Sequence, residues 1–256
     1  MRLLMISACA AGLGACASVD ATPSAGLGGE LTETKSMRAR AAFRIDAPTV
    51  RAARTIRLQP ATVADAADDN INPRQSEVLL AALNQTLCKR LSRHFEMAAE
   101  GQPADLTVRA DITRLGTTNS GSAVVSQITG FISPIPFTPR IPVGMGSLVV
   151  EGVAADAQGA PKAAMVWARG ADMFTTNARA SAIGDAFSLA QAFGKDFAKL
   201  LERGGDPFKS EGAPRRATRK AAARECEAWG KGQGAAGFIG SRLGLPPEMT
   251  AAKPKP

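Results

Sequence analysis

The stretch Leu106-Thr107-Val108-Arg109-Ala110-Asp111-Ile112-Thr113 alternates apolar and polar residues without interruption. Successive side chains of a β-strand point to opposite faces of its sheet, so the pattern predicts a strand with one buried face and one face in water. Farther along, residues 147–154 and 163–168 are two mostly apolar runs, and Asp156-Ala157-Gln158-Gly159 between them suits a type I turn. These two runs therefore predict an antiparallel hairpin.

Two amphipathic helices are expected to cover this sheet. The first starts at Asn72-Pro73-Arg74-Gln75, where Asn suits the cap, Pro the first helical position and Gln a hydrogen bond back to the cap. Its apolar stripe consists of Leu80, Leu83, Leu87 and Leu91. The second helix has its stripe at Ile183, Phe187, Ala190, Phe193, Phe197 and Leu200 and ends at Gly204-Gly205.

Further strands are expected at residues 55–58 and 43–45. The order of strands and helices predicts an α+β fold, a two-layer sandwich in which a mainly antiparallel sheet carries two amphipathic helices on one face.

Composition restricts the chemistry of the chain. Its 256 residues suffice for one domain with extensions, and 45% hydrophobic with 21% charged residues is typical of a globular protein. His94 is the only histidine, which excludes a multi-histidine metal centre, and its place near the end of the first helix favours an interaction with the helix dipole. We expect no metal and no cofactor, and no motif reveals a catalytic activity.

The N-terminus has the form of an export signal. A single Arg2 precedes an apolar run that ends in Leu13-Gly14-Ala15-Cys16, the pattern of a bacterial lipobox, in which the cysteine sulfur accepts diacylglycerol. An ordinary secretory cleavage near Ala8-Cys9-Ala10 or Ala15-Cys16-Ala17 is the alternative. Ala17 and Ser18, rather than an aspartate, follow the cysteine, which favours the outer membrane, with the protein facing the periplasm.

These patterns divide the chain into four parts. Residues 1–15 are expected to be a lipoprotein signal peptide, and residues 16–41 a flexible tether that begins at lipidated Cys16. Residues 42–203 form the α+β domain, with a long insertion at 117–146 that either contacts a partner or folds back on the domain. Residues 204–256 are a basic C-terminal extension rich in glycine and proline.

Several of these features occur together in one bacterial lipoprotein family. They are the lipobox, the strand ending Arg57-Leu58-Gln59-Pro60, the leucine-rich helix, the strand at 104–113, the hairpin from Val150-Glu151-Gly152 to Gly159 and the final phenylalanine-rich helix. Over residues 42–203 the chain resembles the family called domain of unknown function 3313. The resemblance implies an uncharacterised envelope lipoprotein and supplies no catalytic residue.

Charged residues suggest two candidate sites. Asp111 and Glu151 fall on the wet faces of their predicted strands and could pair for acid and base catalysis, although solvated charges on a sheet face are far commoner. Five cations lie within ten residues of the C-terminal extension, at Arg215, Arg216, Arg219, Lys220 and Arg224. They form either a solvated helix or a contact with an anionic envelope polymer or an acidic protein.

Cys88 and Cys226 are the two cysteines outside the signal and the lipidation site. Export to an oxidising compartment permits a disulfide between them, which would staple the C-terminal extension to the domain. The alternative is a buried free Cys88 and a loosely tethered Cys226. Sequence leaves both open, because a disulfide requires a Cα separation that it does not show.

The leading hypothesis is a lipid-anchored periplasmic protein that acts as a non-enzymatic binding or scaffold module. Its expected partners are the membrane, through the lipid, and an envelope protein or anionic envelope polymer, whereas nucleic acid is excluded by export. An envelope carbohydrate hydrolase that uses Asp111 and Glu151 is the alternative. The sequence does not fix the oligomeric state.

Overall fold

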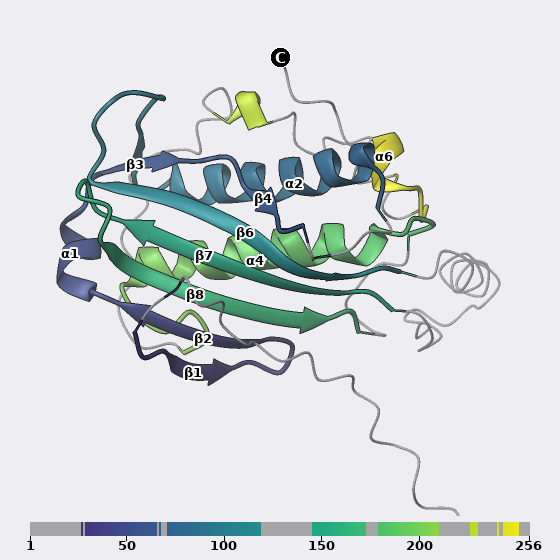
Figure 1. Ribbon diagram of the computed structural model, residues 1–256, viewed down its shortest axis with the longest axis horizontal. Coiled ribbons are helices and arrows are strands. Elements are labelled where there is room, and N and C mark those ends of the chain that lie inside the picture. The colour runs from purple at the N-terminus through teal and green to yellow at the C-terminus, as the bar shows by residue number, and fades with distance from the viewer. Residues whose placement is uncertain are drawn as a thin grey trace, which may run out of the picture.

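A mixed, mostly antiparallel sheet with two long helices packed on one face forms the body of the protein (Figure 1). The computed structural model describes residues 27, 29–65, 67, 71–118, 145–172, 179–209, 226–229, 240 and 243–250. The predicted signal peptide, Cys16, most of the predicted insertion and the five basic residues from Arg215 to Arg224 lie outside these described residues.

The described strands form one eight-stranded sheet in the order β1-β2-β8-β7-β6-β3-β5, with β4 also paired to β6. Neighbours from β1 to β6 are antiparallel, whereas β3 and β4 run parallel to β6 and β5 runs parallel to β3. The strands are β1 (Thr32–Lys35), β2 (Arg40–Ile45), β3 (Thr55–Leu58), β4 (Thr62–Val63), β5 (Glu96–Met97), β6 (Leu106–Gly116), β7 (Ser147–Ala155) and β8 (Pro161–Gly170). This confirms the predicted α+β fold class.

The two long helices are α2 (Pro73–Leu91) and α4 (Gly184–Arg203), beside the short elements α1 (Ala47–Ala52), η2 (Glu227–Trp229) and α6 (Pro247–Thr250). Helix α2 starts as predicted, because Asn72 Oδ1 accepts the Gln75 N–H at 2.9 Å and the Gln75 side chain accepts the Asn72 N–H at 3.1 Å. Its core contacts come from Leu79, Leu83, Leu87 and Leu91, and the predicted Leu80 is only partly buried. No helix among the described residues is long and apolar enough to cross a membrane.

The main core lies between the sheet and the two helices. Phe193 and Phe197 of α4 stack with ring centroids 5.6 Å apart, and Trp167 of β8 meets Phe193 edge to face at 6.0 Å. Both phenylalanines press onto Gly152 of β7, where an added Cβ would lie 2.9 Å from Phe193. Glycine at this position therefore permits the close approach of α4 to the sheet.

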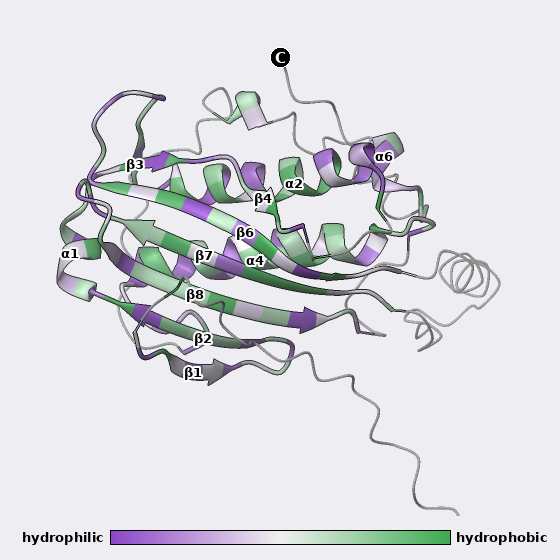
Figure 2. Ribbon diagram, viewed as in Figure 1, coloured by the Kyte–Doolittle hydropathy of each residue, from purple (hydrophilic) through white to green (hydrophobic). Residues whose placement is uncertain are grey.

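The opposite side of the sheet, which no described helix covers, is here called the open face. Strand β6 alternates between hydrophobic and hydrophilic residues as predicted (Figure 2), and its polar residues are the more exposed ones. Strands β7 and β8 differ, because both of their faces are buried at the centre. On the open face Val149, Val153, Ala164, Val166 and Ala168 form a second apolar cluster, and Leu27 and Leu31 pack on it.

The predicted tether at 16–41 is too long, because part of it belongs to the sheet. Strand β1 pairs with β2, and β2 itself begins at Arg40 rather than at residue 42. The β1 sequence Thr-Glu-Thr-Lys does not alternate apolar and polar residues, so its hydrophobicity pattern does not predict a strand. Backbone pairing and the bond from Thr34 Oγ1 to Asp206, 2.7 Å long, hold this edge strand instead.

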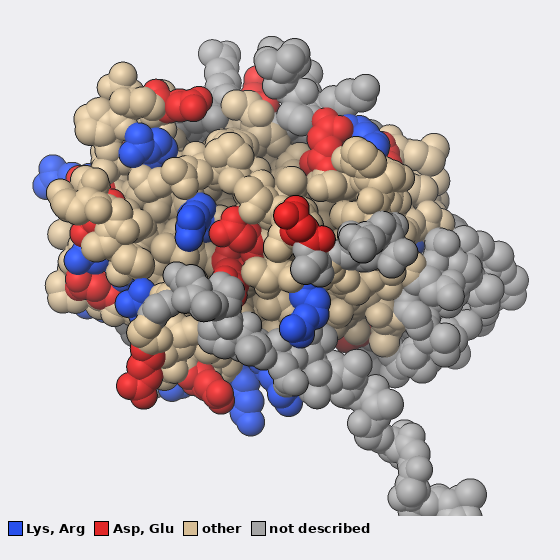
Figure 3. Space-filling view, viewed as in Figure 1, with Lys and Arg blue, Asp and Glu red and all other residues tan. Residues whose placement is uncertain are grey.

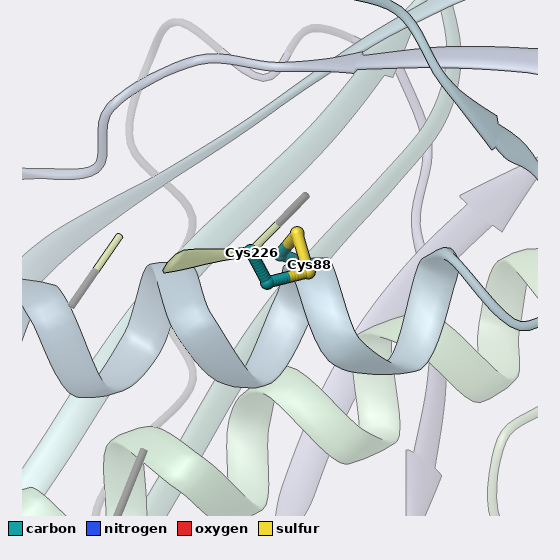
Figure 4. Close-up of a disulfide and its surroundings, with 2 residues drawn as sticks. All are labelled: Cys88 and Cys226. Carbon is teal, nitrogen blue, oxygen red and sulfur yellow. A yellow bond between two sulfur atoms is a disulfide. The ribbon is translucent and has the colours of Figure 1, made fainter. Parts of the chain in front are cut away.

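Parts of the C-terminal extension pack against α2. Cys88 and Cys226 form a disulfide with a Cα separation of 5.7 Å, and both residues are buried (Figure 4). Near the start of α2, Glu248 of α6 accepts hydrogen bonds from Gln75 Nε2 at 2.9 Å and Ser181 Oγ at 2.6 Å. The extension thus contacts α2 both near its start and near its end.

Candidate functional site

A hollow of about 350 Å³ lies on the open face, beside the turn between β7 and β8. It is lined by Leu27, Arg57, Gln59, Thr107, Arg109, Val153, Ala155, Asp156, Ala157, Gly159 and Pro161. The volume falls within the range of small-ligand sites. Two guanidinium groups stand beside an apolar floor, so the hollow favours a ligand that is anionic at one end.

The two arginines come together through the parallel pairing of β3 with β6. Arg57 pairs in register with Thr107, and Arg109 lies two residues farther along the same face of β6. Strand spacing and rise place the Cα atoms of the two arginines roughly 8 Å apart. One small anion can therefore contact both guanidinium groups.

Arg57 is held in place by hydrogen bonds that leave part of its guanidinium unused. Its Nη2 donates to Thr107 Oγ1 at 3.2 Å and its Nη1 to the Gln102 carbonyl at 3.3 Å. Its Nε is buried and has no hydrogen-bond partner within the described part of the chain. Because the Nε is buried, the donors that a ligand in the hollow can reach are the N–H groups of Nη1 and Nη2 that these two hydrogen bonds do not use.

The Arg109 side chain is 55% exposed. Its Nε lies 3.8 Å from Asp111 Oδ2, which is long for a salt bridge and leaves the remaining guanidinium donors facing solvent. An exposed pair of this kind contributes little to stability. Arg109 is therefore able to turn toward a bound anion.

Asp156 is the acidic residue of the hollow, and its charge is already compensated. Its Oδ1 accepts the backbone N–H groups of Ala160 at 2.8 Å and Gln158 at 3.0 Å, and Lys162 Nζ lies 3.5 Å from its Oδ2. These interactions, the Ala160 hydrogen bond foremost, lower the pKa of Asp156 below its ordinary value. The balance of charge in the hollow is therefore positive.

A second, more open hollow of about 720 Å³ adjoins the first and shares Asp156 and Ala157 with it. Its other lining residues are Thr49, Ala52, Ala53, Thr55, Pro103, Ala104, Asp105 and Gln158. Asp105 accepts the backbone N–H groups of Arg54 and Thr55, which lowers its pKa. Both hydrogen bonds go to Oδ2 and tie the Asp105 side chain to the start of β3.

Asp111 and Glu151 stand directly opposite each other on β6 and β7. Asp111 Oδ1 accepts the hydroxyl of Thr62 at 2.7 Å, and Glu151 is buried with only 6% of its surface exposed. The predicted pair is thus adjacent, but Glu151 is buried and neither residue lines the hollows described above. Across the part of the chain that is described, no three side chains of the metal-binding types are grouped to hold an ion.

His94 lies on the other side of the molecule, beyond the end of α2. Its Nε2 is 3.4 Å from Glu202 Oε1 of α4, and both side chains are mostly buried. Burial raises the pKa of Glu202, and the neighbouring His94 opposes that rise. The histidine therefore joins the ends of the two helices, and it lines neither of the two hollows.

Arg57 and Arg109 were not recognised as a pair from the sequence. In the sequence, Arg109 is one polar position of an alternating strand, and Arg57 belongs to a segment that resembles the family. They belong to strands about 50 residues apart in the chain, and a parallel register leaves no local pattern.

One known protein family matches the chain over most of its length. The family described as Protein of unknown function (DUF3313) matches residues 27–197. The chain belongs to the DUF3313 family. The match begins at Leu27, where the described fold begins, and includes β1, so the DUF3313 domain starts before residue 42. No curated protein matches the chain.

Solved structures resemble this DUF3313 chain only distantly. A PelC dodecamer from Paraburkholderia phytofirmans is 12% identical, with a TM-score of 0.35, over 68% of this chain and 99% of that one. A variant of the same PelC is also 12% identical, with a TM-score of 0.34, over 68% of this chain and 98% of that one. A DUF4136 family protein from Bacteroides thetaiotaomicron is 13% identical, with a TM-score of 0.32, over 65% of this chain and 98% of that one.

Proposed function

We propose that this DUF3313 protein is a lipid-anchored envelope lipoprotein that acts as a non-enzymatic binding module. The observation that carries the proposal is the hollow on the open face, in which Arg57 and Arg109 stand beside an apolar floor that includes Leu27. The same residue is the first of the described fold, so the binding site adjoins the point where the N-terminal segment enters the domain.

The lipobox at Leu13-Gly14-Ala15-Cys16 supports the anchor, and the disulfide supports export. Disulfides persist in oxidising compartments such as the periplasm and are rare in the cytosol. Diacylglycerol on Cys16 would hold the protein firmly, because each buried methylene contributes about 0.8 kcal/mol. The residues after Cys16 favour the periplasmic side of the outer membrane as its location.

The proposed partners are an envelope protein or an anionic envelope polymer. Figure 3 shows basic and acidic side chains interspersed on the open face. The described residues of this face therefore form no large patch of a single charge that would attract a partner. Recognition is assigned instead to the hollow and its two guanidinium groups. The five cations between Arg215 and Arg224 remain a proposed second contact for an anionic partner.

Metabolic labelling with a fatty-acid analogue tests the anchor. The wild type should take the label and partition with outer membranes, and Cys16→Ser should take none. Equal labelling of both proteins, or a wild type that is soluble after cell breakage, would refute it.

Site-specific crosslinking in intact cells tests the binding role. A photoreactive residue at Gln59, which is exposed in the hollow, should give a defined product, and one at exposed Arg38 in the turn between β1 and β2 should not. Absence of a Gln59-specific product would count against a binding site in the hollow.

The alternative is a hydrolase of envelope carbohydrate, and the direct opposition of Asp111 and Glu151 favours it. In that case the purified protein would release soluble fragments from envelope carbohydrate, and Asp111→Asn and Glu151→Gln would each abolish release. A wild type without such turnover leaves the binding module as the function.

A further inference from the structure

We propose that the arginine hollow binds the phosphate of an anionic phospholipid headgroup in the membrane that carries the anchor. This inference rests on the proposed function and goes beyond it, because it gives the same site an anionic lipid rather than a protein or a polymer as its ligand. The hollow would then fix how the domain lies on the membrane, because a lipid tether alone leaves its orientation free.

The donors of the hollow match a phosphate group. Arg57 and Arg109 both line the hollow, and their Cα atoms lie roughly 8 Å apart. Arg57 keeps N–H groups on Nη1 and Nη2 beyond its two hydrogen bonds, and the Arg109 side chain is 55% exposed. Thr107 and Gln59 add a hydroxyl and a carboxamide between them. Arginine donors in a fixed fork suit a tetrahedral anion with several acceptor oxygens.

The rest of the hollow matches the part of a lipid next to its phosphate. Val153, Ala155, Pro161 and Leu27 supply apolar surface beside the two guanidinium groups. A volume of about 350 Å³ admits a headgroup and its glycerol but not a pair of acyl chains. The chains would therefore stay in the bilayer while the headgroup enters the hollow.

Chain length brings this face within reach of the bilayer. Leu27, which lines the hollow, follows Cys16 by eleven positions. A fully extended segment of that length spans at most about 40 Å, so the hollow cannot lie farther than this from the lipid-bearing residue. An anionic surface attracts nearby cations with roughly 1 kcal/mol each.

Vesicle binding tests the proposal without the anchor. A chain that begins at Ala17 keeps every described residue and has no acyl group, so any binding comes from the protein surface. Its affinity for vesicles is measured by co-sedimentation, with vesicles of phosphatidylcholine alone or mixed with phosphatidylglycerol. Its affinity for inorganic phosphate is measured separately by calorimetry. Thermal unfolding confirms that each variant is folded.

The double variant Arg57→Gln/Arg109→Gln should bind the phosphatidylglycerol vesicles at least about tenfold more weakly than the wild type. Arg38→Gln/Arg93→Gln removes the same charge from exposed positions outside the hollow and should change the affinity less than twofold. Equal losses in both variants would mean general attraction and would overturn the proposal. Inorganic phosphate bound as tightly as the vesicles would overturn it in favour of a free phosphate ligand.

These outcomes are separate from those that test the anchor. If the protein is labelled at Cys16 but shows no Arg57-dependent vesicle binding, the proposed anchor stands and the lipid ligand is refuted. If it binds vesicles through the hollow but takes no fatty-acid label, the lipid ligand stands and the anchor is refuted.

Discussion

Gly152 determines how closely α4 can approach β7. The Cβ of any other residue would lie 2.9 Å from the ring of Phe193 and 3.0 Å from that of Phe197. Neither ring can move freely, because the two stack on each other and Phe193 also meets Trp167. The tight contact follows from a close-packed interior, in which one extra methyl group is felt.

Gly152→Ala should lower the free energy of unfolding by about 1–3 kcal/mol through overpacking. Gly205→Ala is the matched control, because nothing lies within 4 Å of an added Cβ there, and it should change stability by less than about 0.5 kcal/mol. Urea denaturation measures both. Equal stabilities for the two variants would show that the phenylalanines have room to move.

Asp196 of α4 places a carboxyl group beside Trp167, whose Nε1 donates to it at 3.1 Å. Burial raises the pKa of this carboxyl above its ordinary value of 3.8, and Lys199 opposes the rise. The folded protein therefore holds the proton more tightly than the unfolded chain does. This contribution to stability is fully present below the unfolded pKa and is lost as pH rises through the folded one.

Asp196→Asn keeps an acceptor for Trp167 and removes the titration. Its unfolding free energy, relative to that of the wild type, should increase as pH rises from about 3.8 toward 7. Denaturant titrations at several pH values measure the difference, with Glu100→Gln, an exposed carboxylate variant, as control. Parallel wild-type and Asp196→Asn profiles would contradict the assignment.

Among the elements, those with one wet face were the easiest to predict. The alternation of β6 and the capping residues Asn72 and Gln75 are local signals, and both lie where the structure has them. The two-residue strands β4 and β5 and the polar edge strand β1 have no such signal, because their pairing partners rather than their own side chains hold them. The arginine hollow was missed for the same reason, since it arises from the long-range pairing of β3 with β6.

Helix α2 joins the C-terminal extension to the domain through Cys88 and Cys226. Their sequence separation is 138, and the chain-entropy relation gives about 5 kcal/mol for closing a loop of that size. The segment around Cys226 also packs Trp229 against the main core. Without the disulfide, this segment would have only its side-chain contacts to hold it.

The double variant Cys88→Ala/Cys226→Ala should therefore unfold with a free energy lower by up to about 5 kcal/mol. Wild type treated with reductant should show a comparable loss, and reductant should leave the double variant unchanged. Thiol counting on denatured, unreduced protein completes the test. Two reactive thiols in wild type expressed in the periplasm would exclude the bond.

For the whole molecule, the N-terminal segment belongs to the folded domain as far back as Leu27. Leu27 and Leu31 cover the apolar cluster of the open face, and β1 adds the outermost strand. A chain that begins at Ser36 loses all three. Leu27 is buried and Leu31 is partly buried. A buried leucine contributes roughly 1.5–3 kcal/mol and a partly buried one less, so the loss of unfolding free energy should be on the order of 2–4 kcal/mol.

Thermal unfolding of chains that begin at Ala17, Leu27 and Ser36 measures this boundary. The first two should melt together and the third at a lower temperature, with more binding of a dye that reports exposed apolar surface. Three equal melting temperatures would restore residues 16–41 as a tether without a structural role.

The pairing of β2 with β8 has a consequence for the order of events in the proposed export. Residues 40–45 find their partners at 163–168, so more than a hundred further residues would have to cross the membrane before β2 could enter the sheet. Until then the early strands emerge with unpaired edges, which attract other chains. We expect maturation to occur after translocation rather than during it, and chaperones that shield exposed strands to raise the yield of the native protein.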